Sequence, residues 1–164
     1  MKLATFDDLF VHELKDLDSA ERSLKKGLRR MAKAAVSPEL KKTLEARAAL
    51  VDAHVEILKR LFADLPGSPR GKRCVTMEGL MDGSAHLEVD ADGPIRDAAL
   101  IAAVQRGEHY LLAGYGTART YAGLLGNHTA EKSLQTALNE VGESNKQLKK
   151  LAMHKVNRKA AKKR

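Results

Sequence analysis

Apolar side chains recur every three or four residues along the first long segment of the chain. The series runs Phe10, Leu14, Leu17, Glu21, Leu24, Leu28 and Met31. This spacing places all seven residues on one face of an α-helix, so the acid Glu21 points toward a core together with the leucines. The pattern predicts a helix over residues 4–34 with Thr5 as its N-cap.

A second acid interrupts the apolar face of a helix predicted over residues 94–124. The face consists of Ile101, Val104, Glu108, Leu111, Tyr115, Ala118, Ala122 and Leu125. Removing an ionised carboxylate from water costs several kcal/mol unless a cation or a hydrogen-bonding network compensates. Glu21 and Glu108 are therefore metal ligands, remnants of a metal site, or members of a buried polar network that includes a tyrosine such as Tyr115 or Tyr121.

Two further helices are predicted over residues 38–65 and 130–153, the second of them capped by Thr129. Short turns join the helices in pairs, and each pair forms an antiparallel hairpin. The connection between the pairs is a Pro- and Gly-rich crossover of roughly thirty residues, with a short helix expected from Val75 to Val89. The prediction is an all-α fold, a four-helix bundle with the connectivity of ferritin-like proteins.

The basic residues are concentrated at the C-terminal end. Residues 146–164 contain nine Lys or Arg and no acid, whereas the other 145 residues contain twenty Lys or Arg and twenty-one Asp or Glu. We expect a bundle over residues 1–153 and a basic, flexible tail over residues 154–164. Residues 146–164 either bind nucleic acid weakly and non-specifically through counterion release, or form a solvated terminus. They contain no aromatic residue that could stack on bases.

Composition bears on the cellular compartment of the protein and on its possible partners. No stretch approaches the eighteen or so consecutive apolar residues of a membrane span, and the N-terminus has no signal-peptide pattern. The single cysteine, Cys74, excludes an internal disulfide and suits a reducing compartment. The expectation is a cytoplasmic protein without a membrane partner, and no motif identifies a small-molecule substrate.

The two hairpins bring acids to a similar height in the bundle. With a turn near residue 36, Glu21 lies opposite residue 51, beside Asp52; with a turn near residue 127, Glu108 lies opposite residue 145. The candidate metal ligands are Glu21, Asp52, Glu108, Glu140 and Glu143. Di-iron bundles also need a Glu-x-x-His pair on each of two helices, and neither is present here. His54 could rotate toward the site, but it lies two residues from Asp52 and so on another face of the helix, where a lone histidine is more often a surface or packing residue than a ligand.

Four stretches of the chain resemble the YciE/YciF-like family of ferritin-like bacterial stress proteins. They are residues 8–24 (DLFVHELKDLDSAERSL), 72–80 (KRCVTMEGL), 96–126 (RDAALIAAVQRGEHYLLAGYGTARTYAGLLG) and 150–160 (KLAMHKVNRKA). The resemblance implies a ferritin-like fold, a di-metal centre in typical members, a ferroxidase-like or oxidative-stress role, and homodimers.

The chain departs from the family pattern where the metal ligands belong. Glu21 and Glu108 match family acids, but Leu111 replaces the second Glu of the family's Glu-His-Tyr-Glu run. Residues 49–52 (ALVD) stand where the family has Glu-Glu-Thr-His, and residues 139–142 (NEVG) replace an acidic run.

These departures favour a stress-response protein with a degraded di-metal centre, without enzyme activity or bound metal, acting as a structural or interaction protein. The alternative is an active ferroxidase-like or metal-storage protein that holds Fe or Mn with carboxylates alone.

Overall fold

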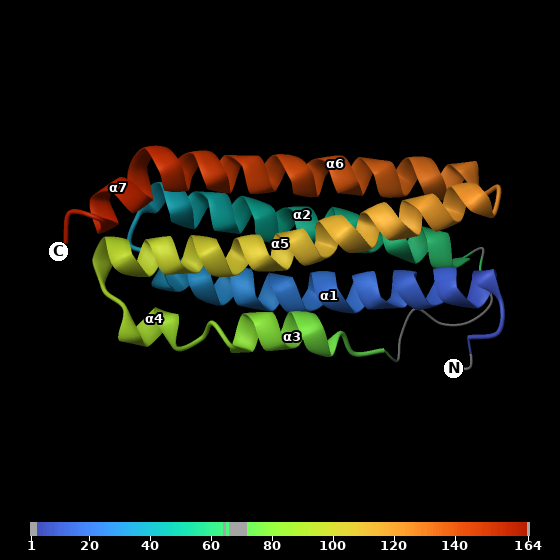
Figure 1. Cartoon of the computed structure of the whole chain (residues 1–164), viewed down its shortest axis with the longest axis horizontal. Helices are drawn as coiled ribbons and strands as arrows, with labels where there is room; N and C mark the ends of the chain where they lie inside the picture. The colour runs from blue at the N-terminus through green and yellow to red at the C-terminus, as the bar shows by residue number, and fades with distance from the viewer. Residues whose placement is uncertain (1–2, 64, 66–71, 164) are drawn as a thin grey trace.

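Four long helices lie side by side in the computed structural model (Figure 1), which describes residues 3–63, 65 and 72–163. The long helices are α1 (Phe6–Ala34), α2 (Pro38–Ala63), α5 (Gly93–Leu124) and α6 (His128–Leu151). The crossover contains two short helices, α3 (Val75–Asp82) and α4 (Leu87–Asp90). The chain ends in a π-helical turn, η1 (Ala152–Val156), followed by α7 (Asn157–Ala160).

The helices pair as the sequence predicts. The α1–α2 and α5–α6 pairs are antiparallel hairpins, and the crossover returns along α1 so that α5 runs parallel to α2 (Figure 1). The described residues contain no strand. The predicted all-α four-helix bundle is therefore confirmed, with the connectivity that ferritin-like bundles share. Residues 66–71 of the predicted Pro- and Gly-rich loop lie outside the described residues.

The ends of the helices follow from local capping chemistry. Thr5 caps α1 as predicted, because its side chain accepts from Asp8 N–H while the Asp8 carboxylate accepts from Thr5 N–H. For α6 the predicted cap was wrong. Asn127, not Thr129, is the N-cap, and its side-chain oxygen accepts from Ala130 N–H at 3.0 Å.

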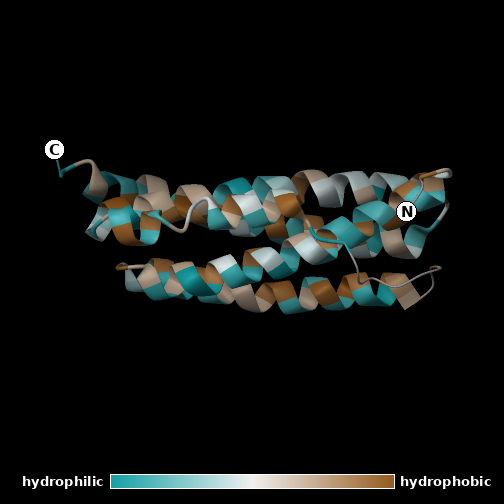
Figure 2. Ribbon diagram, turned by 90° about the horizontal axis from the view of Figure 1, so that it is seen from below, coloured by the Kyte–Doolittle hydropathy of each residue, from teal (hydrophilic) through white to brown (hydrophobic). Residues whose placement is uncertain are grey.

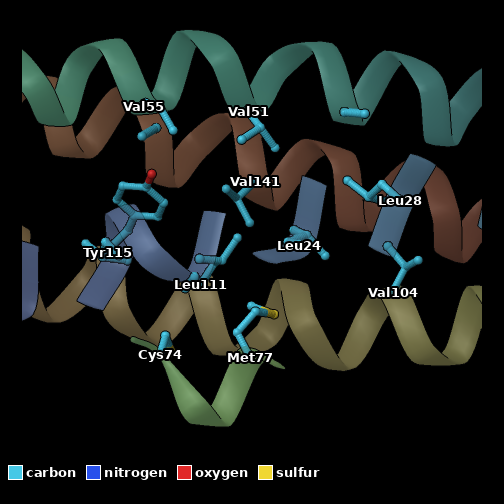
Figure 3. Close-up of a cluster of buried hydrophobic side chains, with 14 of the residues drawn as sticks. Leu24, Leu28, Val51, Val55, Cys74, Met77, Val104, Leu111, Tyr115 and Val141 are labelled. Carbon is cyan, nitrogen blue, oxygen red and sulfur yellow. The ribbon is translucent and has the colours of Figure 1, made fainter. Parts of the chain in front are cut away.

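The core is formed where the apolar faces of the helices meet. Polar and apolar residues alternate along each helix (Figure 2), and side chains from α1, α2, α5, α6 and α3 converge in the interior (Figure 3). The helix α5 approaches α1 closely at Gly114, where an added Cβ would lie 2.8 Å from Leu17 Cδ2. The missing side chain of Gly114 therefore lets the two helices lie close together.

The crossover packs against the bundle through α3. Met77 and Met81 are buried, and α3 contacts both α1 and α5. Small residues make room for them: a Cβ at Gly27 would lie 2.5 Å from Met81 Sδ, and one at Gly107 would lie 3.3 Å from Met77 Sδ. The single short helix predicted over residues 75–89 is divided into α3 and α4, with Gly83 ending the first.

The helical chain continues past residue 153, where the sequence predicts the end of the bundle and a flexible tail over residues 154–164. The turn η1 leads directly into α7, and Val156 is buried. A π-turn adds one residue per turn, so it changes which side chains face the bundle. Arg164 lies outside the described residues.

Candidate functional site

Glu21 of α1 and Glu108 of α5 are both completely buried, with 0 % of either residue exposed. Each occupies a position in an apolar face of its helix, as the periodicity predicts. Two carboxylates from different helices thus share one low-dielectric region. Such groups need compensating charge or hydrogen bonds, and the structure shows which groups supply them.

The compensating cation is Arg47 of α2, whose side chain is 1 % exposed. Its Nε donates to Glu108 Oε1 at 2.8 Å, and its Nη2 donates to Glu21 Oε2 at 3.3 Å. The planar guanidinium presents several donors in a fixed geometry, so one side chain reaches both acids. Arg47 therefore joins three helices through charged hydrogen bonds.

Further groups complete the network around Glu21. His54 Nδ1 lies 2.7 Å from Glu21 Oε1, and Tyr115 O–H donates to the same oxygen at 3.0 Å. The other ring nitrogen of His54, Nε2, lies 3.0 Å from Glu140 Oε2. The side chain of Glu140 is 42 % exposed, so His54 connects the buried acid to the surface of α6.

Glu108 has fewer partners. Besides Arg47, it accepts a hydrogen bond from Ser144 Oγ at 2.8 Å. Its Oε2 atom and Arg47 Nη1 are buried without a hydrogen-bond partner among the described residues. We call Glu21, Arg47, His54 and Glu108 the core network.

The two glutamates respond differently to this environment. Burial raises the pKa of Glu21, but Arg47 and then the hydrogen bonds from His54 and Tyr115 outweigh burial and hold the pKa below its ordinary value. Burial also raises the pKa of Glu108, and here Arg47 and Ser144 do not outweigh it, so the pKa stays above its ordinary value. One guanidinium serves two carboxylates, and the better-supported carboxylate carries the charge more readily.

The structure brings together only some of the predicted metal ligands. Glu21, Glu108 and Glu140 belong to one connected set. Asp52 is exposed and pairs with Lys25 of α1, and Glu143 is exposed with its Oε2 3.8 Å from Lys146 Nζ. The assignment of these five acids as metal ligands stays a prediction.

Sequence reasoning missed the role of Arg47 and placed His54 only in part. As expected, His54 lies on a different face of α2 from the exposed Asp52, but it is fully buried and contacts Glu21 Oε1 instead of lying at the surface. The signal was present in α2, where a face with alternating steps of four and three consists of Leu40, Leu44, Arg47, Val51, His54 and Leu58. Arg47 and His54 lie two helical turns apart on this apolar face, so the pattern predicts buried groups that can pair with the two buried acids.

The donor set of the core network does not suit a pair of metal ions. A di-metal centre needs carboxylates and imidazoles free to bind two cations, whereas both nitrogens of His54 already contact carboxylates. Arg47 stays protonated and occupies the position between the glutamates, where a divalent cation would be repelled. Among residues 3–63, 65 and 72–163, no group of three or more His, Cys, Asp or Glu side chains is arranged to hold a metal ion.

A second polar cluster attaches the crossover to the bundle. Asp16 of α1 accepts from Tyr110 O–H at 2.5 Å and from Cys74 Sγ at 3.3 Å, and it lies 2.8 Å from Lys72 Nζ. Burial raises the pKa of the Cys74 thiol, so it stays protonated and donates rather than acting as a nucleophile. We call Asp16, Lys72, Cys74 and Tyr110 the crossover cluster.

The fold and its interior define a class of protein: an all-α bundle of two helical hairpins with charged groups paired in its core. A family model described as a domain of unknown function (DUF892) matches residues 5–161. The chain therefore belongs to this family.

Relatives of known structure agree with this assignment. The chain is 36 % identical to protein YciF of Escherichia coli over 162 residues, which are 98 % of each sequence. It superimposes on the crystal structure of that protein, described as a stress protein, with a TM-score of 0.89 and 33 % identity over 94 % of this chain and 98 % of the other. YcfI of Rhodopseudomonas palustris, provisionally described as a structural protein, gives a TM-score of 0.86 and 32 % identity over 90 % and 95 % of the two chains.

In the part of the chain that the structure describes, no helix combines the length and the hydrophobicity that a membrane crossing requires.

Proposed function

We propose that this protein is a stress-associated helical bundle that acts through its surface, as a structural or interaction protein, and that its core has exchanged a metal centre for an ion network. The observation that carries the proposal is the guanidinium of Arg47 between Glu21 and Glu108. A fixed organic cation provides the charge that two buried acids need, without supplying Lewis-acid or redox chemistry.

The rest of the site supports a non-catalytic role. Glu21 and Glu108 accept hydrogen bonds from Arg47 and its neighbours, and the raised pKa of the buried Tyr115 keeps that hydroxyl protonated as a donor to Glu21. Burial is the main cause of that shift, followed by the charge of Glu21. YciF is described as a stress protein and YcfI, provisionally, as a structural protein, and both descriptions agree with such a role.

Elemental analysis tests the proposal. Protein purified from cells grown with both iron and manganese, and with no metal added later, should contain metal well below one ion per chain. Titration with Fe²⁺ or Mn²⁺ under anaerobic conditions should give no saturable binding of a metal pair. Two ions per chain that are lost in Glu21→Ala, but kept in the exposed control variant Glu45→Ala, would overturn the proposal in favour of an active centre.

A variant of Arg47 tests whether removing the guanidinium allows the two carboxylates to bind metal. If the guanidinium excludes cations, Arg47→Ser should increase binding of Mn²⁺ relative to the parent protein, because the two carboxylates are then left without their cation. Circular dichroism first establishes that the variant is helical. A folded Arg47→Ser protein that binds Mn²⁺ no better than the parent would show that Arg47 is not what excludes the metal.

A further inference from the structure

The C-terminal end of the bundle is folded and strongly basic, and none of its residues belongs to the core network. Residues 146–163 contain eight Lys or Arg and no acid, and all eight are exposed. In Figure 1 this segment forms the red end of α6, the π-turn and α7, at the end of the bundle where α2 and α5 begin. We call residues 146–163 the basic segment.

Buried side chains fix the basic segment in place. Leu148, Leu151, Ala152 and Val156 are each 7 % exposed or less, and both η1 and α7 contact α5. The π-turn rotates the chain so that Val156 faces the bundle while Arg158 and Lys159 remain outside. The cations are therefore presented by a helix of defined orientation rather than by a flexible strand of chain.

Most of these cations have no acidic partner. Lys155 pairs with Glu39 at 2.6 Å and Lys146 lies 3.8 Å from Glu143. The remaining six form no ion pair within the described ranges: Lys149, Lys150, Arg158, Lys159, Lys162 and Lys163. Exposed like charges that are close in sequence and unpaired repel one another, so a polyanion that neutralises several at once gains free energy from counterion release.

We propose that the basic segment binds duplex nucleic acid without sequence preference. At about 1.5 Å per helical residue, the helical part of the segment, residues 146–160, extends over roughly 22 Å, more than half of one turn of a duplex, so several phosphates lie within reach at once. The segment has no aromatic side chain to stack on unpaired bases. Its apolar side is already packed against the bundle, which leaves little hydrophobic surface to insert into a membrane.

The test measures binding of fluorescent duplexes of two unrelated sequences by anisotropy, with the full-length protein, at salt concentrations from about 50 to 200 mM. Both duplexes should bind equally, with an affinity that falls steeply with salt. A variant carrying Lys149→Gln, Lys150→Gln, Arg158→Gln and Lys159→Gln should bind about tenfold more weakly or worse at low salt. The slope of log affinity against log salt should decrease by about 0.9 for each phosphate that the variant no longer neutralises.

A control variant with the same change in net charge shows whether the loss of binding depends on where the cations lie or only on the net charge of the protein. It carries Lys59→Gln, Arg60→Gln, Arg106→Gln and Lys132→Gln, four exposed residues outside the basic segment, and it should bind as the parent does. Three results would overturn the proposal: no duplex binding by the parent protein at low salt, equal losses in the variant and the control, or tighter binding to single strands or to phosphatidylglycerol vesicles than to duplex.

Discussion

The core network and the crossover cluster both pair charged side chains inside the protein, but they differ in how far those side chains are buried. Each brings together carboxylate and cationic side chains from separate segments of the chain: Glu21, Glu108 and Arg47 in the first, Asp16 and Lys72 in the second. In the core network, Glu21, Arg47 and Glu108 have side chains that are 1 % exposed or less. In the crossover cluster, Asp16 is 14 % exposed and Lys72 is 27 % exposed, so water still reaches both charges.

The difference lies in what remains after one partner is removed. A charge without its partner near the surface is solvated by water, whereas a charge left in the core is not. The geometry of hydrogen bonds is similar in the two places, with distances from 2.5 to 3.3 Å. The comparison therefore predicts that equal changes in chemistry have unequal costs, and that the cost follows burial.

The largest expected effect is that of Arg47→Met. The substitution keeps an unbranched side chain but leaves Glu21 and Glu108 without their cation, so we expect a decrease of about 3–5 kcal/mol in the free energy of unfolding. Urea denaturation followed by circular dichroism measures it. The matched control is Lys25→Met, which breaks the ion pair with the exposed Asp52 and should cost about 1 kcal/mol or less.

A compensated variant shows whether the cost comes from uncompensated charge. Arg47→Met combined with Glu21→Gln and Glu108→Gln removes all three charges while keeping the shapes of the side chains. Replacing a buried ion group in this way is often nearly neutral, so the triple variant should recover most of the stability of the parent. A triple variant as unstable as Arg47→Met alone would mean that packing, rather than charge, is what Arg47 contributes.

A smaller and more local effect is expected from Asp16→Asn. The amide retains an acceptor oxygen but lacks the charge that Lys72 pairs with, at a cost of about 1–2 kcal/mol. Because the crossover cluster holds only one edge of the bundle, amide hydrogen exchange should increase in α3 more than in α5. The exposed Asp90→Asn serves as the control. Exchange that increased equally in α3 and α5 would show that the cluster supports the whole bundle.

Much of this fold could be predicted from the sequence because its helices are long and their apolar faces are regular. The helices α1 and α5 end at the predicted residues and begin within two residues of the predicted starts, and the height at which Glu21 meets residues of α2 follows from counting back from the turn. The bond between Tyr115 and Glu21 was one of the predicted pairings. The helix limits and this height depend on one helix or one hairpin, and the Tyr115 bond follows because both side chains lie on regular apolar faces.

The local pattern places Arg47 and His54 on one regular face of α2 but does not identify their partners, for a physical reason. On α2 the apolar residues cover a broad face, and a polar residue at the edge of such a face can point toward water or toward a partner. Arg47 is buried only because Glu21 and Glu108 approach it from two other helices, 26 and 61 residues away along the chain. The π-turn after Leu151 has no comparable sequence signal, so the packing of α7 was not expected either.

The smallest effect concerns the unequal support of the two core acids. The pKa of Glu108 lies above its ordinary value of 4.5 in the folded protein because of its burial. Between pH 4.5 and the pKa of Glu108 in the folded protein, the folded state binds more protons than the unfolded state. Stability therefore falls as the pH rises through this window, and the contribution of Glu108 is lost. Glu21 has the opposite sign: its lowered pKa means that its contribution is lost only as the pH falls below 4.5.

Unfolding free energies of the parent protein and of Glu108→Gln, measured from pH 4.5 to pH 7.5, isolate this contribution. The parent should lose stability relative to Glu108→Gln as the pH rises, because the amide does not ionise. The exposed Glu45→Gln is the matched control and should run parallel to the parent. If the parent instead gained stability relative to Glu108→Gln with rising pH, Arg47 would outweigh burial at Glu108 as it does at Glu21, and the guanidinium would hold both core acids ionised.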